Sequence, residues 1–405
     1  MKIKANRIML LFIVTGAYWY RLFTSGSGLL GTSYLYSVFS VLAMFIILMT
    51  NVWSKRLTRS FSKKNIISKT TICYTIFVVY AIITLFWASD QKSGWMGVLS
   101  YLTTALIIIE IPILAHTQED LIFICRICLI NVLITCGLAL YECFSGNFVF
   151  GYTSSVSISS WSFMGMHSPI VQYNHPNNLS CALLLSYPFC IIALNKRKNR
   201  YKLILVLIAI AMITIFIASD SRLALIIFGV YFGLWALING KGNRKIIWIC
   251  VILLIGLFVA TVFADNINTL FHTGMEEARP KIWENAFNNF LSSSGAGVGV
   301  GNAYIANAAS ASASYIGRPC HNQVLEILEE TGIVGCTVWM IWFVLLFKFV
   351  NEKLKSNNNL FTQNGWLFLI LFIPMTVQQS SMLGSFTIWV LFGIVTAIGL
   401  IKYDE

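Results

Sequence analysis

Long runs of hydrophobic residues alternate with short polar segments along the whole chain. A helix that crosses about 30 Å of hydrocarbon needs roughly 20 mostly apolar residues. Twelve runs approach this length, at about residues 8–23, 34–50, 70–88, 98–115, 121–141, 177–194, 203–218, 223–238, 246–264, 333–350, 365–379 and 386–401. The pattern predicts an all-α, polytopic membrane protein with about 12 transmembrane helices.

The composition agrees with this interpretation. Hydrophobic residues make up 57% of the 405-residue chain and charged residues 11%, whereas a soluble domain carries about 25% charged residues. A soluble enzyme is excluded because a core of this size cannot hide so much apolar surface. A disordered chain is excluded because disorder requires few apolar residues and high charge.

The formal net charge of +12 is explained by where the cations fall. With the N-terminus inside, most lysines and arginines lie in inner segments, as the positive-inside rule requires. We therefore expect both termini in the cytoplasm, and no nucleic acid partner. The outer segments hold few cations, which are Lys92, Arg222, Arg279, Lys281 and Arg318.

Two outer segments are long, and long connections are often functional. We expect short interfacial helices within them and the active site on the extracytoplasmic face. The predicted organisation is N-terminal transmembrane helices (1–141), an extracytoplasmic loop (142–176), central transmembrane helices (177–264), a large extracytoplasmic catalytic loop (265–332) and C-terminal transmembrane helices (333–405).

Arginine and histidine are the candidate chemical groups of the outer face. Arginine binds phosphate oxygens in a bidentate manner, and a neutral histidine is well suited to act as a base near pH 7. Arg222 stands at the outer mouth of a predicted span. Its alternative role is structural, either reaching the membrane interface or pairing with Asp220.

A second arginine precedes a predicted amphipathic helix. Pro280 fits the first turn of a helix, which places Arg279 at its start. Trp283, Phe287 and Phe290 recur at helical spacing and predict a helix that lies on the membrane surface. Arg279 is then either a site residue or a solvated cation.

His321 opens a segment in which apolar and acidic residues alternate at helical spacing up to Gly332, a typical helix end. The start of a helix favours neutral imidazole, the form that a general base requires. A lone histidine is also often structural. The segment from His175 to Asn178 enters a span, where Asn177 or Asn178 would cap the helix or bind sugar hydroxyls.

The glycine-rich segment 295–302 looks like a phosphate-binding loop, but no strand precedes it and no Lys-Ser/Thr follows. A nucleotide site is therefore disfavoured, and close approach to a ligand or a neighbouring helix remains open. Cys143 and Cys320 would form a disulfide only with Cα atoms within about 7 Å.

These segments together resemble the bacterial O-antigen ligase and polymerase family. The family's arginine motif, Arg followed after ten residues by Gly, is matched by Arg222 and Gly233. Its histidine motif, His followed after ten residues by Gly, is matched by His321 and Gly332. Other motifs of the family resemble further segments of the chain. These matching positions are His321, Asn322, Gly332 and Gly335, His175 to Asn178, Arg279 with Trp283, and Gly297 to Asn302.

The resemblance implies an inverting glycosyltransferase that takes glycans from undecaprenyl diphosphate on the extracytoplasmic face. His321 would be the general base, and Arg222 and Arg279 would stabilise the leaving diphosphate. We expect no metal and no cofactor, because the arginines neutralise the leaving group and no Asp-x-Asp pair is present. The expected substrate-binding residues are Asn322, Arg318, Lys281, Trp283, His175, Asn177 and Asn178.

Three functions remain open. The first is a polymerase that joins lipid-linked repeat units into O-antigen, capsule or exopolysaccharide, with a chain-length regulator and a flippase as implied pathway partners. The second is a ligase that moves the finished glycan to lipid A core or another acceptor; Ile226, where some ligases have leucine, disfavours it. The third is a flippase, which would place charges near mid-membrane rather than outside.

Overall fold

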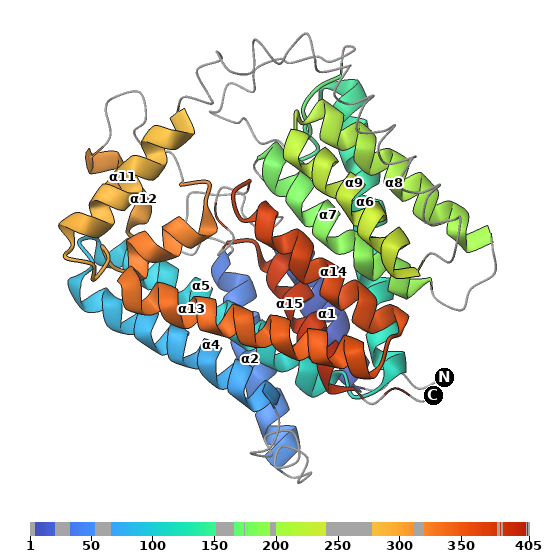
Figure 1. Cartoon of the computed structure of the whole chain (residues 1–405), viewed down its shortest axis with the longest axis horizontal. Helices are drawn as coiled ribbons and strands as arrows, with labels where there is room; N and C mark the ends of the chain where they lie inside the picture. The colour runs from blue at the N-terminus through green and yellow to red at the C-terminus, as the bar shows by residue number, and fades with distance from the viewer. Residues whose placement is uncertain are drawn as a thin grey trace.

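The computed structural model describes residues 5–20, 33–52, 66–150, 166–173, 175–194, 200–239, 278–310, 320–378, 381, 384–401 and 403. Secondary structure within these ranges is entirely helical (Figure 1). The helices are α1 (Ala5–Trp19), α2 (Ser33–Val52), α4 (Ile66–Ile83), η2 (Thr84–Trp87), α5 (Gln91–Leu114), α6 (Gln118–Ser145), α7 (Pro176–Ala193), α8 (Arg200–Ala218), α9 (Arg222–Asn239), α11 (Ala278–Ser292), α12 (Ala303–Ser310), α13 (Gln323–Ser356), α14 (Leu360–Met375) and α15 (Phe386–Leu400).

The predicted spans coincide with these helices, except that the one at 246–264 lies outside the described residues. By length and composition, five helices of the described ranges can cross a membrane on their own. The all-α, polytopic membrane fold is confirmed. The five helical segments are Lys69–Trp87, Gln91–Leu114, Gln118–Ser145, Pro176–Ala193 and Gln323–Ser356.

Capping residues fix where several helices begin and end. Thr117 and Asp120 form a reciprocal capping box at the start of α6, and Asn359 and Thr362 form one at the start of α14. Such boxes satisfy backbone N–H groups that have no partner inside the helix. Gly146 ends α6 in the left-handed conformation (φ 69°), which glycine adopts without steric cost.

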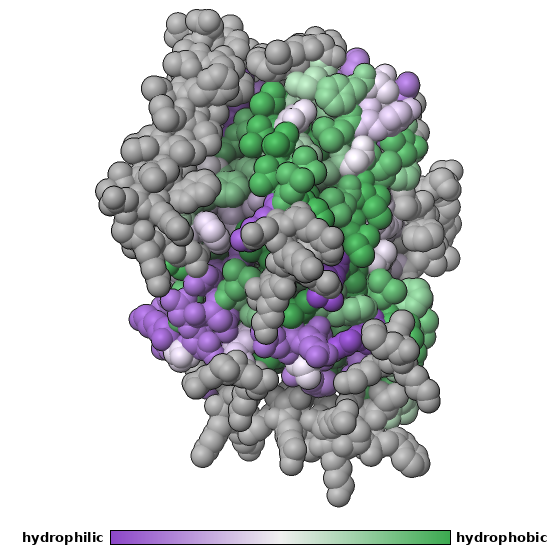
Figure 2. Space-filling model, turned by 90° about the vertical axis from the view of Figure 1, so that its right-hand side faces the viewer, coloured by the Kyte–Doolittle hydropathy of each residue, from purple (hydrophilic) through white to green (hydrophobic). Residues whose placement is uncertain are grey.

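Aromatic rings from α4, α13 and α15 form the centre of the core. The ring centroid of Trp342 lies 4.7 Å from that of Tyr74, 5.2 Å from Phe392 and 6.1 Å from Trp389. The outward faces are apolar as well, with Phe45, for example, more than half exposed. Figure 2 shows hydrophobic residues over much of the described part of one side, as a bilayer-facing surface requires.

The helices run between two ends of the bundle, and some neighbours, such as α2 and α5, run in the same direction. At one end, Arg7 of α1 donates to Glu119 (3.1 Å) and Asp120 (3.0 Å) at the start of α6. At this same end, Tyr403 beyond α15 stacks on Phe361 of α14, with ring centroids 5.3 Å apart.

The opposite end holds the last residues of α1 and the first residues of α7 and α15. Thr387 of α15 donates to the carbonyl oxygen of Ala17 (3.2 Å), and Gln172, just before α7, donates to that of Tyr18 (2.8 Å). We call this the site end, because the candidate residues described below gather there.

Candidate active site

A histidine caps α7 at the site end. The His175 Nδ1 atom accepts a hydrogen bond from the backbone N–H of Asn177 at 3.1 Å. The cap predicted at Asn177 or Asn178 was therefore wrong by two or three positions. Asn178 is buried and donates to the carbonyl oxygen of Tyr173 (3.4 Å). The asparagines contribute instead to contacts with neighbouring segments.

His321 lies against His175. Their ring centroids are 5.8 Å apart with an interplanar angle of 60°, an edge-to-face arrangement. His321 adopts a positive φ of 52°, which is uncommon for a residue with a side chain. The next residue, Asn322, caps α13 by accepting from the N–H of Leu325 (3.2 Å). The two histidines thus meet where α7 and α13 begin.

The helix α11 approaches this pair of histidines and carries the second arginine. Trp283 donates from its indole nitrogen to the carbonyl oxygen of Cys320 at 2.9 Å, next to His321. Burial, and then the positive charge of Arg279, lower the pKa of His175 to about 4. Arg279 is therefore close enough to influence His175 electrostatically.

The helix predicted here is present as α11, and its membrane-surface position stays a prediction. Ile282 and Ala286 of α11 are buried, while Phe287 is nearly half exposed. The buried face of α11 packs on the first part of α13. The aromatic spacing could not reveal this neighbour, because packing against protein and packing against lipid both select apolar residues.

Arg222 begins α9 at the same end of the bundle. Its guanidinium donates from Nε to Asp220 at 3.0 Å and from one terminal nitrogen at 3.4 Å, so the structural pairing anticipated from the sequence is present. Both side chains remain partly exposed, at 27% for Arg222 and 40% for Asp220. Such exposed pairs contribute little stability.

A polar network connects the arginine segment to the α7 cap. Ser221 donates to the side-chain oxygen of Asn177 at 2.8 Å, and Gln378 donates to Ser221 at 2.9 Å. Beyond α14, the carbonyl oxygen of Thr376 accepts from the N–H of Gln323 at 2.9 Å. These bonds join the site-end termini of α7, α9, α13 and α14, and thereby place the arginine and histidine motifs at one end.

The glycine-rich segment contacts helices. The N–H groups of Val298 and Gly299 donate to the carbonyl oxygens of Glu329 (2.8 Å) and Glu330 (3.0 Å), and Ile333 donates back to the oxygen of Gly295 (3.0 Å). These bonds satisfy backbone groups at the break in α13. The sequence left open whether this segment approaches a ligand or a neighbouring helix. These hydrogen bonds show that it approaches the helix α13.

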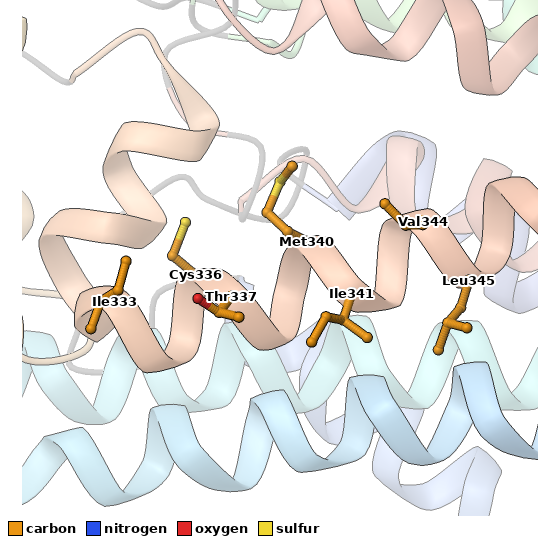
Figure 3. A pocket seen from close by; sticks show the side chains of 7 residues that line it. All are labelled: Ile333, Cys336, Thr337, Met340, Ile341, Val344 and Leu345. Atoms are coloured by element: carbon orange, nitrogen blue, oxygen red, sulfur yellow. The ribbon is translucent and has the colours of Figure 1, made fainter.

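The break itself is at Gly332. The helix α13 is continuous in its bounds, but Gly332 has non-helical torsion angles (φ 64°, ψ −169°). The predicted helix end at Gly332 is thus a sharp turn between a short first segment and the long apolar one. A hollow of about 460 Å³ lies along the long segment, and Figure 3 shows the side chains that line it, which all belong to α13. Its lining residues are Ile333, Cys336, Thr337, Met340, Ile341, Val344 and Leu345.

Two relationships to known proteins bear on this site. Residues 206–340 match the family model described as O-antigen ligase. The chain is also 23% identical over 351 residues to the teichuronic acid biosynthesis protein TuaE of Bacillus subtilis (strain 168), covering 80% of this chain and 70% of that protein. Both matches support the O-antigen polymerase and ligase family. They support a membrane enzyme of polysaccharide biosynthesis, and the resemblance indicated by the motifs is confirmed.

The segment matched to the O-antigen ligase model contains all three predicted catalytic residues, Arg222, Arg279 and His321. Among the predicted substrate-binding residues, Lys281 is exposed on α11, and Arg318 lies outside the described residues. Within the described ranges, no group of three or more His, Cys, Asp or Glu side chains is arranged to hold a metal ion. Cys143 and Cys320 are both free thiols.

Sequence reasoning missed the acidic side chains that support the site. Glu329 accepts from Asn289 of α11 (2.8 Å) and Asn307 of α12 (3.1 Å), which fastens both helices to the first segment of α13. In the sequence these side chains appeared only as the acidic positions of a helical pattern. Glu329 accepts hydrogen bonds from two asparagines that are far from it in the sequence, and this arrangement appears only in the folded chain.

Proposed function

We propose that this protein is an inverting membrane glycosyltransferase that joins lipid-linked oligosaccharide repeat units into a polysaccharide on the extracytoplasmic face. The observation that carries the proposal is the meeting of His321, His175 and the Arg279-bearing helix at the end of the bundle where Arg222 begins α9. A base and cations for a diphosphate leaving group are the groups that this reaction needs.

In the proposed reaction, a hydroxyl oxygen of the acceptor sugar attacks the anomeric carbon of the donor from the side opposite the diphosphate. His321 takes the hydroxyl proton as the new bond forms. The bond from the anomeric carbon to the diphosphate oxygen breaks, and the diphosphate leaves with the electron pair. Arg222 and Arg279 stabilise the charge that develops there.

The lipid-diphosphate donor class is supported by the surroundings of these residues. The apolar hollow along α13 begins directly after Gly332, so its lining residues continue from the polar segment into the membrane-spanning part. A lipid tail would contact these apolar side chains while its diphosphate reaches the site end. The name of the related protein, which concerns teichuronic acid biosynthesis, agrees with a polysaccharide product.

The ligase is the second candidate, because the matching family model is described as O-antigen ligase. One experiment separates the two. The purified protein is placed in liposomes with a single substrate, the undecaprenyl-diphosphate-linked repeat unit. A polymerase forms a ladder of products from this substrate alone, whereas a ligase forms no ladder and transfers only when a separate acceptor is added. Absence of both products contradicts the proposed glycosyltransferase.

A further inference from the structure

We propose that His175 is a positioning residue that holds the imidazole of His321, and that the first turn of α7 fixes the His175 ring for this task. The inference rests on the proposed function, in which His321 accepts a proton. It assigns to His175 a role that differs from the substrate contact expected from its sequence position.

The ring contact is the first argument. The two imidazoles meet edge to face, with centroids 5.8 Å apart. His321 precedes α13 and has a left-handed backbone (φ 52°), so the regular geometry of a helix does not set the direction of its side chain. A ring packed against it limits the rotamers that it can adopt. Positioning of this kind lowers the entropy lost when a base reaches its substrate.

The helix cap is the second argument. The His175 Nδ1 atom accepts from the N–H of Asn177 (3.1 Å), so the proton of the neutral ring is on Nε2. The side chain of Asn177 is held by Ser221 (2.8 Å) and contacts Gln378 (3.4 Å). The ring of His175 is therefore oriented by α7, and α7 is tied at this point to α9 and to the end of α14.

The charge state is the third argument. Burial and Arg279 on α11 both disfavour the protonated form of His175, so this ring stays neutral near pH 7. A neutral neighbour does not oppose the positive charge that His321 gains when it accepts a proton. A charged group at this position would oppose it, because like charges disfavour each other at short distance.

Two substitutions separate the cap from the ring. The variant His175→Asn keeps a good helix cap but removes the ring. The variant His175→Phe keeps an aromatic ring but removes the cap acceptor. His167→Asn is the matched control, since His167 is an exposed histidine of the same outer segment.

Two measurements are made on each variant in the reconstituted full-length protein. The first is kcat and KM for transfer from the lipid-linked repeat unit. The second is the rate at which diethylpyrocarbonate modifies His321, determined by mass spectrometry, which requires no enzymatic activity. Failure of the proposed reaction therefore leaves the ring contact testable.

We expect His175→Asn to lower kcat at least tenfold with KM within threefold of wild type, and to raise the His321 modification rate more than threefold. His175→Phe keeps a ring but loses the cap that orients it, so its modification rate should lie between those of wild type and His175→Asn, and His167→Asn should change neither quantity. A wild-type modification rate in His175→Asn would overturn the proposal. So would an effect confined to KM, which would indicate direct donor binding.

Discussion

At the scale of single residues, Glu142 shows how one buried carboxylate shapes the approach to the site. Its oxygens accept from the backbone N–H groups of Val149 (3.0 Å), Ile170 (2.8 Å) and Val171 (2.8 Å). Val171 has a φ of 46°, which is strained for a β-branched residue. The carboxylate therefore holds an unfavourable backbone conformation four residues before His175.

The variant Glu142→Gln should destabilise the protein by about 1–3 kcal/mol, because an amide group presents an N–H donor where the backbone needs an acceptor. Thermal unfolding in detergent, followed by tryptophan fluorescence, measures this loss. Glu119→Gln is the control, since the Glu119 side chain is 83% exposed and its ion pair with Arg7 contributes little. Equal midpoints in the two variants would show that the Glu142 contacts are dispensable.

The pKa of His175 predicts a pH dependence of stability. The folded pKa is about 4, below the usual value of about 6.5. Between these values the unfolded chain binds a proton that the folded chain does not, so stability falls as the pH falls from about 6.5 to 4. The contribution is at most about 3 kcal/mol.

Wild type should therefore lose more stability across this pH range than His175→Asn, which has no imidazole at this position. The measurement is the unfolding midpoint of both proteins at several pH values in the same detergent. Parallel pH profiles would contradict the burial of a neutral His175.

The sequence allowed the chemical residues to be chosen because arginine and histidine are few on the predicted outer face. It did not allow their partners to be identified. The pairing of Arg222 with Asp220 follows from their closeness in sequence, but the contact of His175 with His321 joins residues 146 positions apart. The cap was misassigned because asparagine is the commoner capping residue, whereas here an imidazole nitrogen accepts the bond.

At the scale of elements, the turn at Gly332 joins the short segment that follows His321 to the long apolar part of α13. A Cβ atom added at Gly332 would collide with the carbonyl oxygen of Gly295 and would lie 2.6 Å from that of Ala296. The residue also has a positive φ, which disfavours a side chain. Glycine is required here for both reasons, and the glycine-rich segment is the partner that leaves no room for a side chain.

The variant Gly332→Ala should lower the thermal midpoint strongly, with a loss of stability above about 2 kcal/mol. Gly137→Ala in α6 is the matched control, since nothing lies within 4 Å of its added Cβ atom. That change should leave the midpoint unchanged or slightly higher, because alanine has the better helix propensity. Similar midpoints in both variants would contradict the tight packing at the break.

Helix positions were predictable from hydrophobic runs, and the break at Gly332 from its place at the end of an alternating pattern. The segment that packs against Gly332 was not predictable. Glycines 297, 299 and 301 resemble a ligand-binding loop in sequence, yet they are needed because backbone from α5, from α13 and from Ala88 after η2 approaches them. The sequence shows where the glycines are, but it does not show which backbone packs against them.

At the scale of the whole molecule, residues at opposite ends of the bundle can be used to test which end faces outward. The positive-inside pattern predicts that α11 faces outward and the end of α13 faces the cytoplasm. Glu284 of α11 and Lys355 of α13 are both exposed and lie towards opposite ends. A membrane-impermeant maleimide should label Glu284→Cys in intact cells and Lys355→Cys only after permeabilisation. The reverse pattern would place the candidate site in the cytoplasm.

The central claim is that His321 accepts the proton of the attacking hydroxyl. The most direct measurement is the initial rate of transfer by His321→Ala in liposomes, compared with wild type at equal amounts of folded protein. General base catalysis contributes about 100- to 10,000-fold, so we expect His321→Ala to lose at least 100-fold in rate with an unchanged unfolding midpoint. A transfer rate close to that of wild type would contradict it.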